Sequence, residues 1–331
     1  MTEPASVPPP EPPETRRVRI GISACLLGQE VRYNGGHKRD SFLTDVFGRY
    51  VEWVPVCPEV EIGLGVPRPP IRLTWAAGGE VRLVMPDTGE DLTERMTAYA
   101  ERRVDDLAGL GLAGYVFKKD SPSCGMERVK VWPGDGPPSK EGRGLFAEVL
   151  MRRLPHLPIE EEGRLNDPSL RDSFISRVYV YDRWLEAEHA GWRPASLMRF
   201  HERHKLLLMA RNQAGMRRLG RLLGDSTPKD DPRALAAAYL DGMTAVLRRA
   251  PTRRGHTNVL QHLAGYVSDG IDRGDRAELA ESIDRYRRGL VPLIVPLTLL
   301  RHHVRRLGVE YLCNQVYLEP HPHELMLLNH V

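Results

Sequence analysis

Residues 112–124, LAGYVFKKDSPSC, contain a short apolar run that is followed by polar residues and then by a cysteine. Such a run, bounded by glycine on one side and by serine and proline on the other, indicates a buried β-strand. The runs VRIGISA (18–24) and YVEWVPV (50–56) have the same character, and a cysteine follows each of them directly. The sequence therefore predicts three strands, each leading to a cysteine: Cys25, Cys57 and Cys124.

Helix-like segments alternate with these strands. LTERMTAYAERRVDDLAGLG (92–111) and GLFAEVLMRRL (144–154) have apolar residues at helical spacing. EVRLVMP (80–86) and LPIEEEG (157–163) are further strand candidates. The alternation predicts an α/β domain over residues 16–165, with a doubly wound, mainly parallel sheet. Parallel strands end at one edge of their sheet, where ligands bind, so we expect the three cysteines to converge there.

The second half of the chain lacks this alternation. Helical periodicity, punctuated by glycine and proline, runs through most of it, and we predict a separate all-α domain over residues 166–331. After Asn166 there are 25 Lys and Arg against 19 Asp and Glu, so this half is mildly basic. Contact with RNA through the helical domain is therefore one expectation, although no dense basic run supports it.

The composition is that of a globular protein, with 41% hydrophobic and 27% charged residues. Residues 1–15 are rich in proline and predict a disordered leader without the features of a signal peptide. The most apolar run, GLVPLIVPLTLL (289–300), is too short to span a bilayer and contains two prolines. We expect a cytoplasmic protein, in which four widely separated cysteines do not indicate a disulfide framework.

Three converging thiolates are suited to a soft metal. A structural zinc site usually has four ligands with paired cysteines, and this sequence has no Cys-x-x-Cys pair. Cys313, the fourth cysteine, lies in a helical segment of the second half. The pattern favours an iron–sulfur cluster held by Cys25, Cys57 and Cys124, with one iron left open. The alternative is three unrelated core cysteines, since free cysteine is commonly buried.

Polar residues around the cysteines add candidate chemistry. Glu59, two residues after Cys57, is a candidate for moving a proton. Ser121 and Ser123 are candidates for hydrogen bonds to a cluster sulfur or a substrate, or for a turn or cap. Asn34 and Arg68 are candidate ligands of a polar substrate; their alternatives are a turn and a surface charge. Lysines 118 and 119, at a strand end, are more often solvated than catalytic.

SACLLGQEVRYNGGHK, VPVCPEVEIGLGVPRPP and FKKDSPSCG together resemble motifs of the thiouracil desulfurase (TudS) family, over residues 18–165. The resemblance implies an α/β domain with a [4Fe-4S] cluster on Cys25, Cys57 and Cys124, whose open iron takes the sulfur of a thiolated nucleobase. It also implies a catalytic role for Glu59 and for Ser123. The family usually has aspartate where this chain has Asn34, which questions an acid role at that position.

The second half is similar to the YbgA-type domain, through FHERHKLLLMARN, HLAGYV and YLCNQVYLEPHPHEL. This resemblance implies a helical fold and no established function. Ten of the twelve histidines lie after Asn166. His201 and His204 share a helix face, and with Glu202 they suggest a metal site, although capping and hydrogen bonding are commoner histidine roles.

The leading interpretation is iron–sulfur-dependent, non-redox desulfuration of a thiolated nucleobase, nucleoside or RNA, converting C=S to C=O. One alternative is a sulfur-inserting enzyme that modifies tRNA, but the sequence contains no P-loop and no pyrophosphatase loop of the SGGxDS type. The other alternative is a non-enzymatic sensor in which the cluster controls binding of nucleic acid or a partner.

Overall fold

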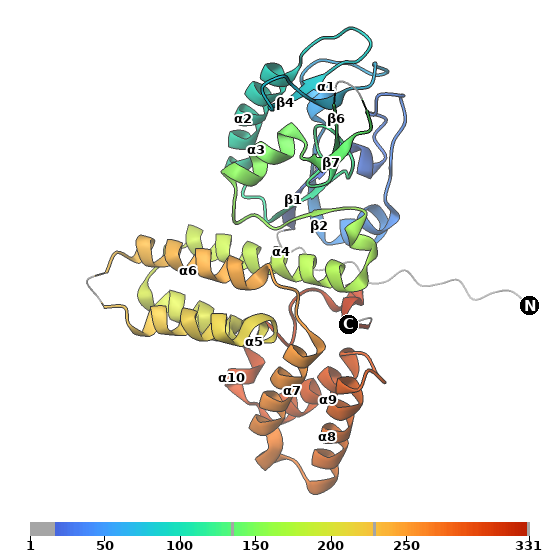
Figure 1. The fold of residues 1–331 in the computed structure, drawn as a ribbon. Coiled ribbons are helices and arrows are strands. Elements are labelled where there is room, and N and C mark those ends of the chain that lie inside the picture. The colour runs from blue at the N-terminus through green and yellow to red at the C-terminus, as the bar shows by residue number, and fades with distance from the viewer. Residues whose placement is uncertain (1–16, 134–135, 228–229, 330–331) are drawn as a thin grey trace, which may run out of the picture.

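The structure is a computed structural model that describes residues 17–133, 136–227 and 230–329. An α/β half and a helical half lie one above the other (Figure 1). This arrangement confirms the predicted fold class. The proline-rich leader lies outside the described residues.

The main sheet contains four parallel strands in the order β2-β1-β5-β8. The strands predicted next to the three cysteines are all in this sheet, and the predicted strand over 157–163 forms one of its two edges. The bounds are β1 (Val18–Ser23), β2 (Val51–Val56), β5 (Gly114–Phe117) and β8 (Ile159–Glu161).

A second four-stranded sheet, in the order β4-β3-β6-β7, was not anticipated from the sequence. It pairs β3 with β6 in parallel and has antiparallel pairs at its two edges. The predicted strand over 80–86 belongs to this mixed sheet and not to the parallel one. The bounds are β3 (Arg72–Trp75), β4 (Val81–Val84), β6 (Val129–Trp132) and β7 (Ser139–Gly142).

Helices cover both faces of the parallel sheet. Alternate residues of β5 explain how: Tyr115 and Phe117 pack with α2 (Thr93–Gly109) and α3 (Leu145–Arg153), whereas Val116 faces the other side. That other side is covered by α4 (Pro168–His189), whose Phe174, Ile175 and Val178 share a core with β1. The first helix of the helical half therefore completes the core of the α/β half.

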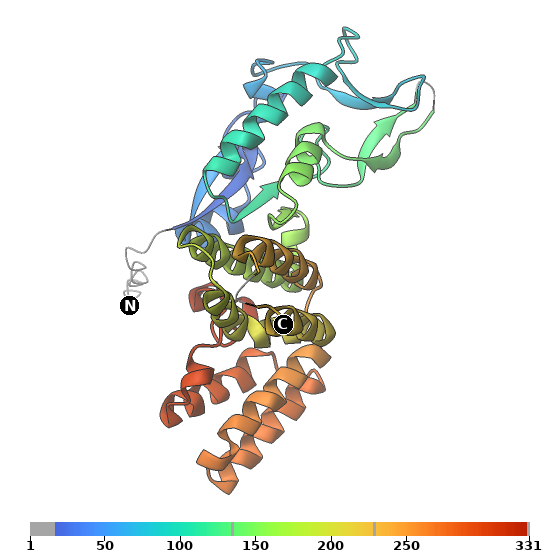
Figure 2. The same cartoon turned by 90° about the vertical axis from the view of Figure 1, so that its left-hand side faces the viewer.

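The helical half packs around Trp184 and Tyr239, which are fully buried in one large apolar core. Figure 2 shows its helices below the sheets, with α2 running along the side of the α/β half. The long helix α5 changes direction at Asn212, whose side chain caps the second part by accepting a hydrogen bond from the Gly215 amide. The helices are α5 (Pro194–Gly224), α6 (Pro232–Leu247), α7 (Arg253–Val267), α8 (Arg273–Arg287), α9 (Ile294–Leu307) and α10 (Glu310–Cys313).

Among the described residues, no helix combines the length and the apolar character needed to cross a lipid bilayer.

Candidate active site

A cavity of about 610 Å³ opens at the carboxyl ends of β1, β2 and β5. Cys25, Cys57 and Cys124 all line it, as do Glu59 and Ser123. The structure thus brings together residues that are far apart in the sequence, at the sheet edge where the strand pattern places them.

Each cysteine is held by the short segment that follows its strand. Cys25 lies in the 3₁₀ turn Ala24–Leu27 directly after β1, and its carbonyl accepts a hydrogen bond from Lys38 at 2.9 Å. Cys57 is the residue before α1 (Pro58–Glu61), and its amide donates to the Glu61 carboxylate at 3.0 Å. Both cysteines are thereby fixed by the main chain and by local contacts, and not only by side-chain packing.

The loop that carries Cys124 rests on the N-terminus of α3. The amides of Leu145, Phe146 and Ala147 donate to carbonyls of Pro122 and Ser123, at distances between 3.1 and 3.2 Å. These are amide groups of a first helical turn, which have no partner within their own helix. The helix therefore anchors the cysteine loop while satisfying its own free donors.

Four polar side chains form a connected wall of the cavity. Ser123 donates to Oε1 of Glu59 at 2.7 Å, and its Oγ lies 3.0 Å from that of Ser121. Arg68 donates to Oε2 of Glu59 from Nη2 at 2.6 Å and from Nε at 3.1 Å. Glu59 and Ser123, to which the family resemblance assigns catalytic roles, are therefore in direct contact. Arg68 contacts Glu59, and Ser121 contacts Ser123. Roles in the reaction stay predictions.

The candidate substrate ligands are placed differently from one another. Ser121 lines the cavity, and its Oγ accepts the amide hydrogens of Ser123 and Cys124 at 3.3 and 3.1 Å. Arg68 also lines the cavity, but only 3% of its side chain is exposed. Asn34 is exposed, is not among the residues that line the cavity, and accepts a hydrogen bond from the Gly36 amide at 3.2 Å. Its structural surroundings are those of a turn residue.

An ion pair between Lys118 and Glu162 also lines the cavity. Nζ of Lys118 lies 2.5 Å from Oε1 of Glu162, and only 16% and 12% of these side chains are exposed. The sequence predicts a solvated Lys118 and does not single out Glu162 as a site residue. A usable signal existed, because both residues directly follow strands of the parallel sheet, β5 and β8.

Burial raises the pKa of all three cavity thiols, that of Cys25 to about 11, with the nearby Lys118 acting in the opposite direction. Metal binding to cysteine requires the thiolate, so a cation must supply the energy to deprotonate these groups. Soft metals do so most effectively.

The donor set is compatible with an iron–sulfur cluster. Within the described residues, no three His, Cys, Asp or Glu side chains are grouped around one point as the ligands of a single metal ion are. A four-iron cluster makes a different demand, since each cysteine binds its own iron on a larger group. Three thiols that line one cavity of about 610 Å³ are compatible with that demand, and the fourth cysteine, Cys313, is exposed elsewhere.

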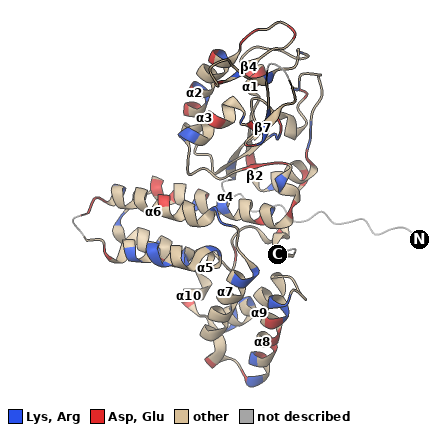
Figure 3. Ribbon diagram, in the orientation of Figure 1, with Lys and Arg blue, Asp and Glu red and all other residues tan. Residues whose placement is uncertain are grey.

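The histidines singled out in the helical half are buried structural residues. Nδ1 of His201 lies 3.0 Å from the Tyr239 hydroxyl, and Nδ1 of His204 donates to the Phe200 carbonyl at 2.7 Å. Glu202, between them, is exposed. Figure 3 shows Lys and Arg on α5, α8 and α9, with several acidic residues among them on α8.

Two family models match the chain, one in each half. A model described as 2-thiouracil desulfurase matches residues 20–162. A second model, described as a protein of unknown function (DUF1722), matches residues 205–322. The uncharacterized protein YbgA of Escherichia coli (strain K12) is 31% identical over 156 residues, which are 47% of this chain and 92% of YbgA.

The uncharacterized protein YbbK of Bacillus subtilis (strain 168) is 30% identical over 152 residues, 45% of this chain and 98% of YbbK. A solved structure, the [4Fe-4S]-dependent thiouracil desulfidase TudS, is 31% identical and covers 47% of this chain and 99% of its own, with a TM-score of 0.39. The chain therefore belongs to the 2-thiouracil desulfurase family through its α/β half and to the YbgA-like DUF1722 family through its helical half.

Proposed function

We propose that this protein removes sulfur from a thiolated nucleobase or nucleoside, converting C=S to C=O without net electron transfer. One observation carries the proposal: three cysteines and a hydrogen-bonded Glu59–Ser123 pair line a single cavity. The match to the 2-thiouracil desulfurase family over the same half of the chain supports it. A cytoplasmic location remains part of the proposal, as does RNA contact through the basic helical half.

We further propose that Cys25, Cys57 and Cys124 hold a [4Fe-4S] cluster whose fourth iron has no protein ligand. When bound there, the cluster supplies a soft Lewis acid that polarises the C=S bond. Overall, one water adds its oxygen to the carbon and the sulfur leaves as hydrogen sulfide.

Glu59 and Ser123 supply the proton chemistry. Oε1 of Glu59 accepts the Ser123 hydrogen bond at 2.7 Å and has a second lone pair for a proton taken from the attacking water. Ser123, which is buried, can turn its hydroxyl from Glu59 to a nitrogen or oxygen of the substrate and orient or protonate it.

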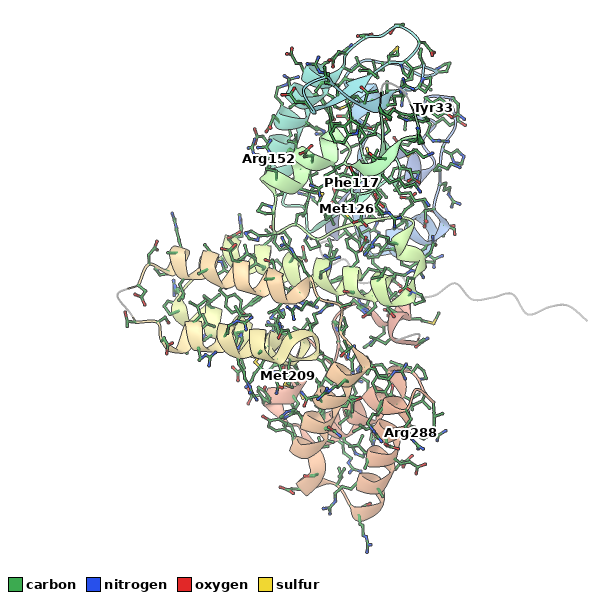
Figure 4. All side chains as sticks on the ribbon, viewed as in Figure 1. Tyr33, Phe117, Met126, Arg152, Met209 and Arg288 are labelled. Carbon is green, nitrogen blue, oxygen red and sulfur yellow. The ribbon has the colours of Figure 1, made fainter. Side chains whose placement is uncertain are left out.

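Tyr33 gives the mouth of the cavity an aromatic surface. Its side chain lines the cavity and is 43% exposed, a large fraction for an aromatic residue. Figure 4 shows it at the outer edge of the α/β half, whereas Phe117 lies inside. A planar base entering the cavity can stack on such a ring, which stabilises binding of bases without selecting their sequence.

The test uses protein purified and reconstituted without oxygen. Iron and acid-labile sulfide are measured for the wild type and for the Cys25→Ser, Cys57→Ser and Cys124→Ser variants, followed by sulfide release from 2-thiouracil and 4-thiouridine. We expect each cysteine variant to lose the cluster. The Glu59→Gln variant should keep the cluster and release sulfide at least about 100-fold more slowly.

A matched control is Glu52→Gln, because Glu52 on β2 is an exposed carboxylate paired with Arg19 of β1. It should match the wild type in both iron content and rate. Absence of iron after reconstitution would overturn the cluster proposal, and an unchanged rate in Glu59→Gln would remove Glu59 from the mechanism.

A further inference from the structure

Every nitrogen of the Arg68 guanidinium is engaged by the protein itself. Nε and Nη2 donate to Oε2 of Glu59, Nη1 donates to the Gly65 carbonyl at 2.8 Å, and Nη2 donates to the Val31 carbonyl at 3.0 Å. Only 3% of the side chain is exposed. A ligand entering the cavity thus meets an arginine that already donates four hydrogen bonds within the protein, with at least one from each of its three nitrogens.

These contacts restrict Glu59. Oε2 is held by two donors of Arg68, and Oε1 is held by the Ser123 hydroxyl at 2.7 Å. Glu59 itself lies on α1, a helix of only four residues, which gives its side chain little support. A carboxylate bound at both oxygens keeps one orientation, and Arg68 holds one of the two oxygens.

Arg68 also joins two segments of the cavity wall. Its backbone amide donates to the Tyr33 carbonyl at 2.8 Å, and its guanidinium binds the carbonyls of Val31 and Gly65. The turn that carries Tyr33 and the segment that carries Glu59 are therefore fastened to the same residue. Loss of the side chain would remove its bonds to Val31, Gly65 and Glu59, and would leave the backbone bond to Tyr33 in place.

We infer that Arg68 is a positioning residue: it fixes the Glu59 carboxylate for proton transfer and does not bind the substrate, the role suggested by the sequence. This inference rests on the proposed desulfuration. It differs from a binding role in its kinetic consequence, because misplacement of a reacting group by about 1 Å can lower the rate about 100-fold.

The first experiment measures the kinetics of sulfide release by Arg68→Met after reconstitution. We expect kcat to fall about 100-fold, KM to stay within about threefold, and iron content to match the wild type. Added guanidinium ion should restore part of the lost kcat, since it can occupy the vacated space beside Glu59. A rise in KM with unchanged kcat would assign Arg68 to substrate binding and overturn the inference.

A double-mutant cycle tests whether Arg68 acts through Glu59. In the Glu59→Gln background, Arg68→Met should lower kcat by no more than about threefold, because the group it positions is already disabled. A full additive loss would contradict the inference. Should Arg68→Met fail to hold the cluster, Arg68→Lys, which keeps the charge but donates from a single nitrogen, is expected to lose at least about tenfold in kcat.

The control is Arg95→Met, because Arg95 binds the Ile62 carbonyl in the same segment without touching Glu59. It should leave kcat unchanged. Hydrogen exchange gives a readout independent of turnover: in Arg68→Met, the amides of Gly35 and Gly36 and those of residues 61–65 should exchange faster than in the wild type. Unchanged exchange in both segments would overturn the inference even if no thiolated compound proved to be a substrate. An inactive wild type with faster exchange in the variant would refute only the proposed function.

Discussion

Ser121 and Ser123 are two residues apart on one loop, and their hydroxyl groups lie 3.0 Å apart, but each also has partners that the other lacks. Ser121 accepts the amide hydrogens of Ser123 and Cys124 and so shapes the loop around the cysteine. Ser123 is buried, and it donates to the carboxylate of Glu59. The first serine supports the geometry of the loop at Cys124, a proposed cluster ligand, whereas the second contacts Glu59, the proposed proton acceptor.

Alanine at each serine should separate these effects. We expect Ser123→Ala to keep its iron and to release sulfide at least about 100-fold more slowly, because Glu59 loses its hydroxyl partner. Ser121→Ala should lose iron more readily during gel filtration, because two amides lose an acceptor worth about 1 kcal/mol each. Equal iron loss in both variants, with activity proportional to iron, would contradict the distinction.

Helix α3 anchors the loop that carries Cys124. Its first-turn amides bind the loop before Cys124, and Gly144 at its start lies directly against that loop. A methyl group on Gly144 would lie 2.5 Å from the Ser123 carbonyl oxygen and 2.7 Å from the Cys124 amide nitrogen. Both are backbone atoms, which cannot move aside without shifting the cysteine.

Gly144→Ala should therefore impair the site more than the fold. We expect the variant to keep its circular dichroism spectrum and most of its thermal stability, but to bind less than about half of the wild-type iron. The comparison is Gly109→Ala, which places a methyl group in open space at the end of α2. Normal iron content in Gly144→Ala would show that the loop tolerates the shift.

At the scale of the whole molecule, the two halves share a core. Phe174, Ile175 and Val178 of α4 are fully buried against the parallel sheet, and Trp184 on the same helix is buried in the helical half. Gly114 of β5 permits this close approach, since a methyl group there would lie 2.8 Å from Val178. One helix thus belongs to both cores.

Phe174→Ala should consequently destabilise the α/β half, although the residue lies in the helical half. Removing a fully buried phenylalanine costs about 3–5 kcal/mol. Hydrogen exchange should rise in β1 as well as in α4, and calorimetry should show both halves unfolding at a lower temperature. An increase in hydrogen exchange that is confined to α4 would indicate that the halves unfold independently.

Buried histidines make the helical half sensitive to acid. Burial lowers the pKa of His204 to about 3, with Arg183 and Arg203 adding to the effect and the Phe200 carbonyl opposing it. Burial also lowers the pKa of His256 to about 4, with Asp172 raising it and Arg211 lowering it. Both residues are therefore neutral in the folded chain and take up a proton more readily when unfolded, where the pKa is 6.5.

The unfolded state binds more protons than the folded state below pH 6.5. The contribution of these histidines to the free energy of unfolding is therefore fully present above that pH and falls as the pH drops towards 4. The pKa differences correspond to about 5 kcal/mol for His204 and about 3 kcal/mol for His256. Urea unfolding at pH 7.5, 6, 5 and 4 should show the decline, and His204→Phe should reduce its slope. An identical slope in the variant would exclude His204 as a source.

The strand ends were predictable because a buried parallel strand is a short apolar run, and three of these runs lead to a cysteine. The mixed sheet was missed, since β3, β6 and β7 have only four residues each and carry charged residues such as Arg72, Lys130 and Lys140. Four residues are too few for an alternating pattern to stand out.

Roles that depend on burial could not be predicted from local sequence. Arg68 lies between prolines in a segment that looks exposed, yet long-range contacts with Val31 and Glu59 bury it. The packing of α4 on the sheet was equally hidden, because an apolar helix face does not reveal which partner it covers.

The three cysteines follow strands β1, β2 and β5, so the cavity exists only after distant parts of the chain have paired. The cores that hold those strands together contain mainly apolar side chains from α2, α3 and α4. We therefore expect the polypeptide to fold first and the proposed cluster to be inserted into the finished scaffold. This is the reverse of a zinc finger, in which the metal drives folding. Chaperones that deliver a cluster would therefore meet a native protein and not a nascent chain.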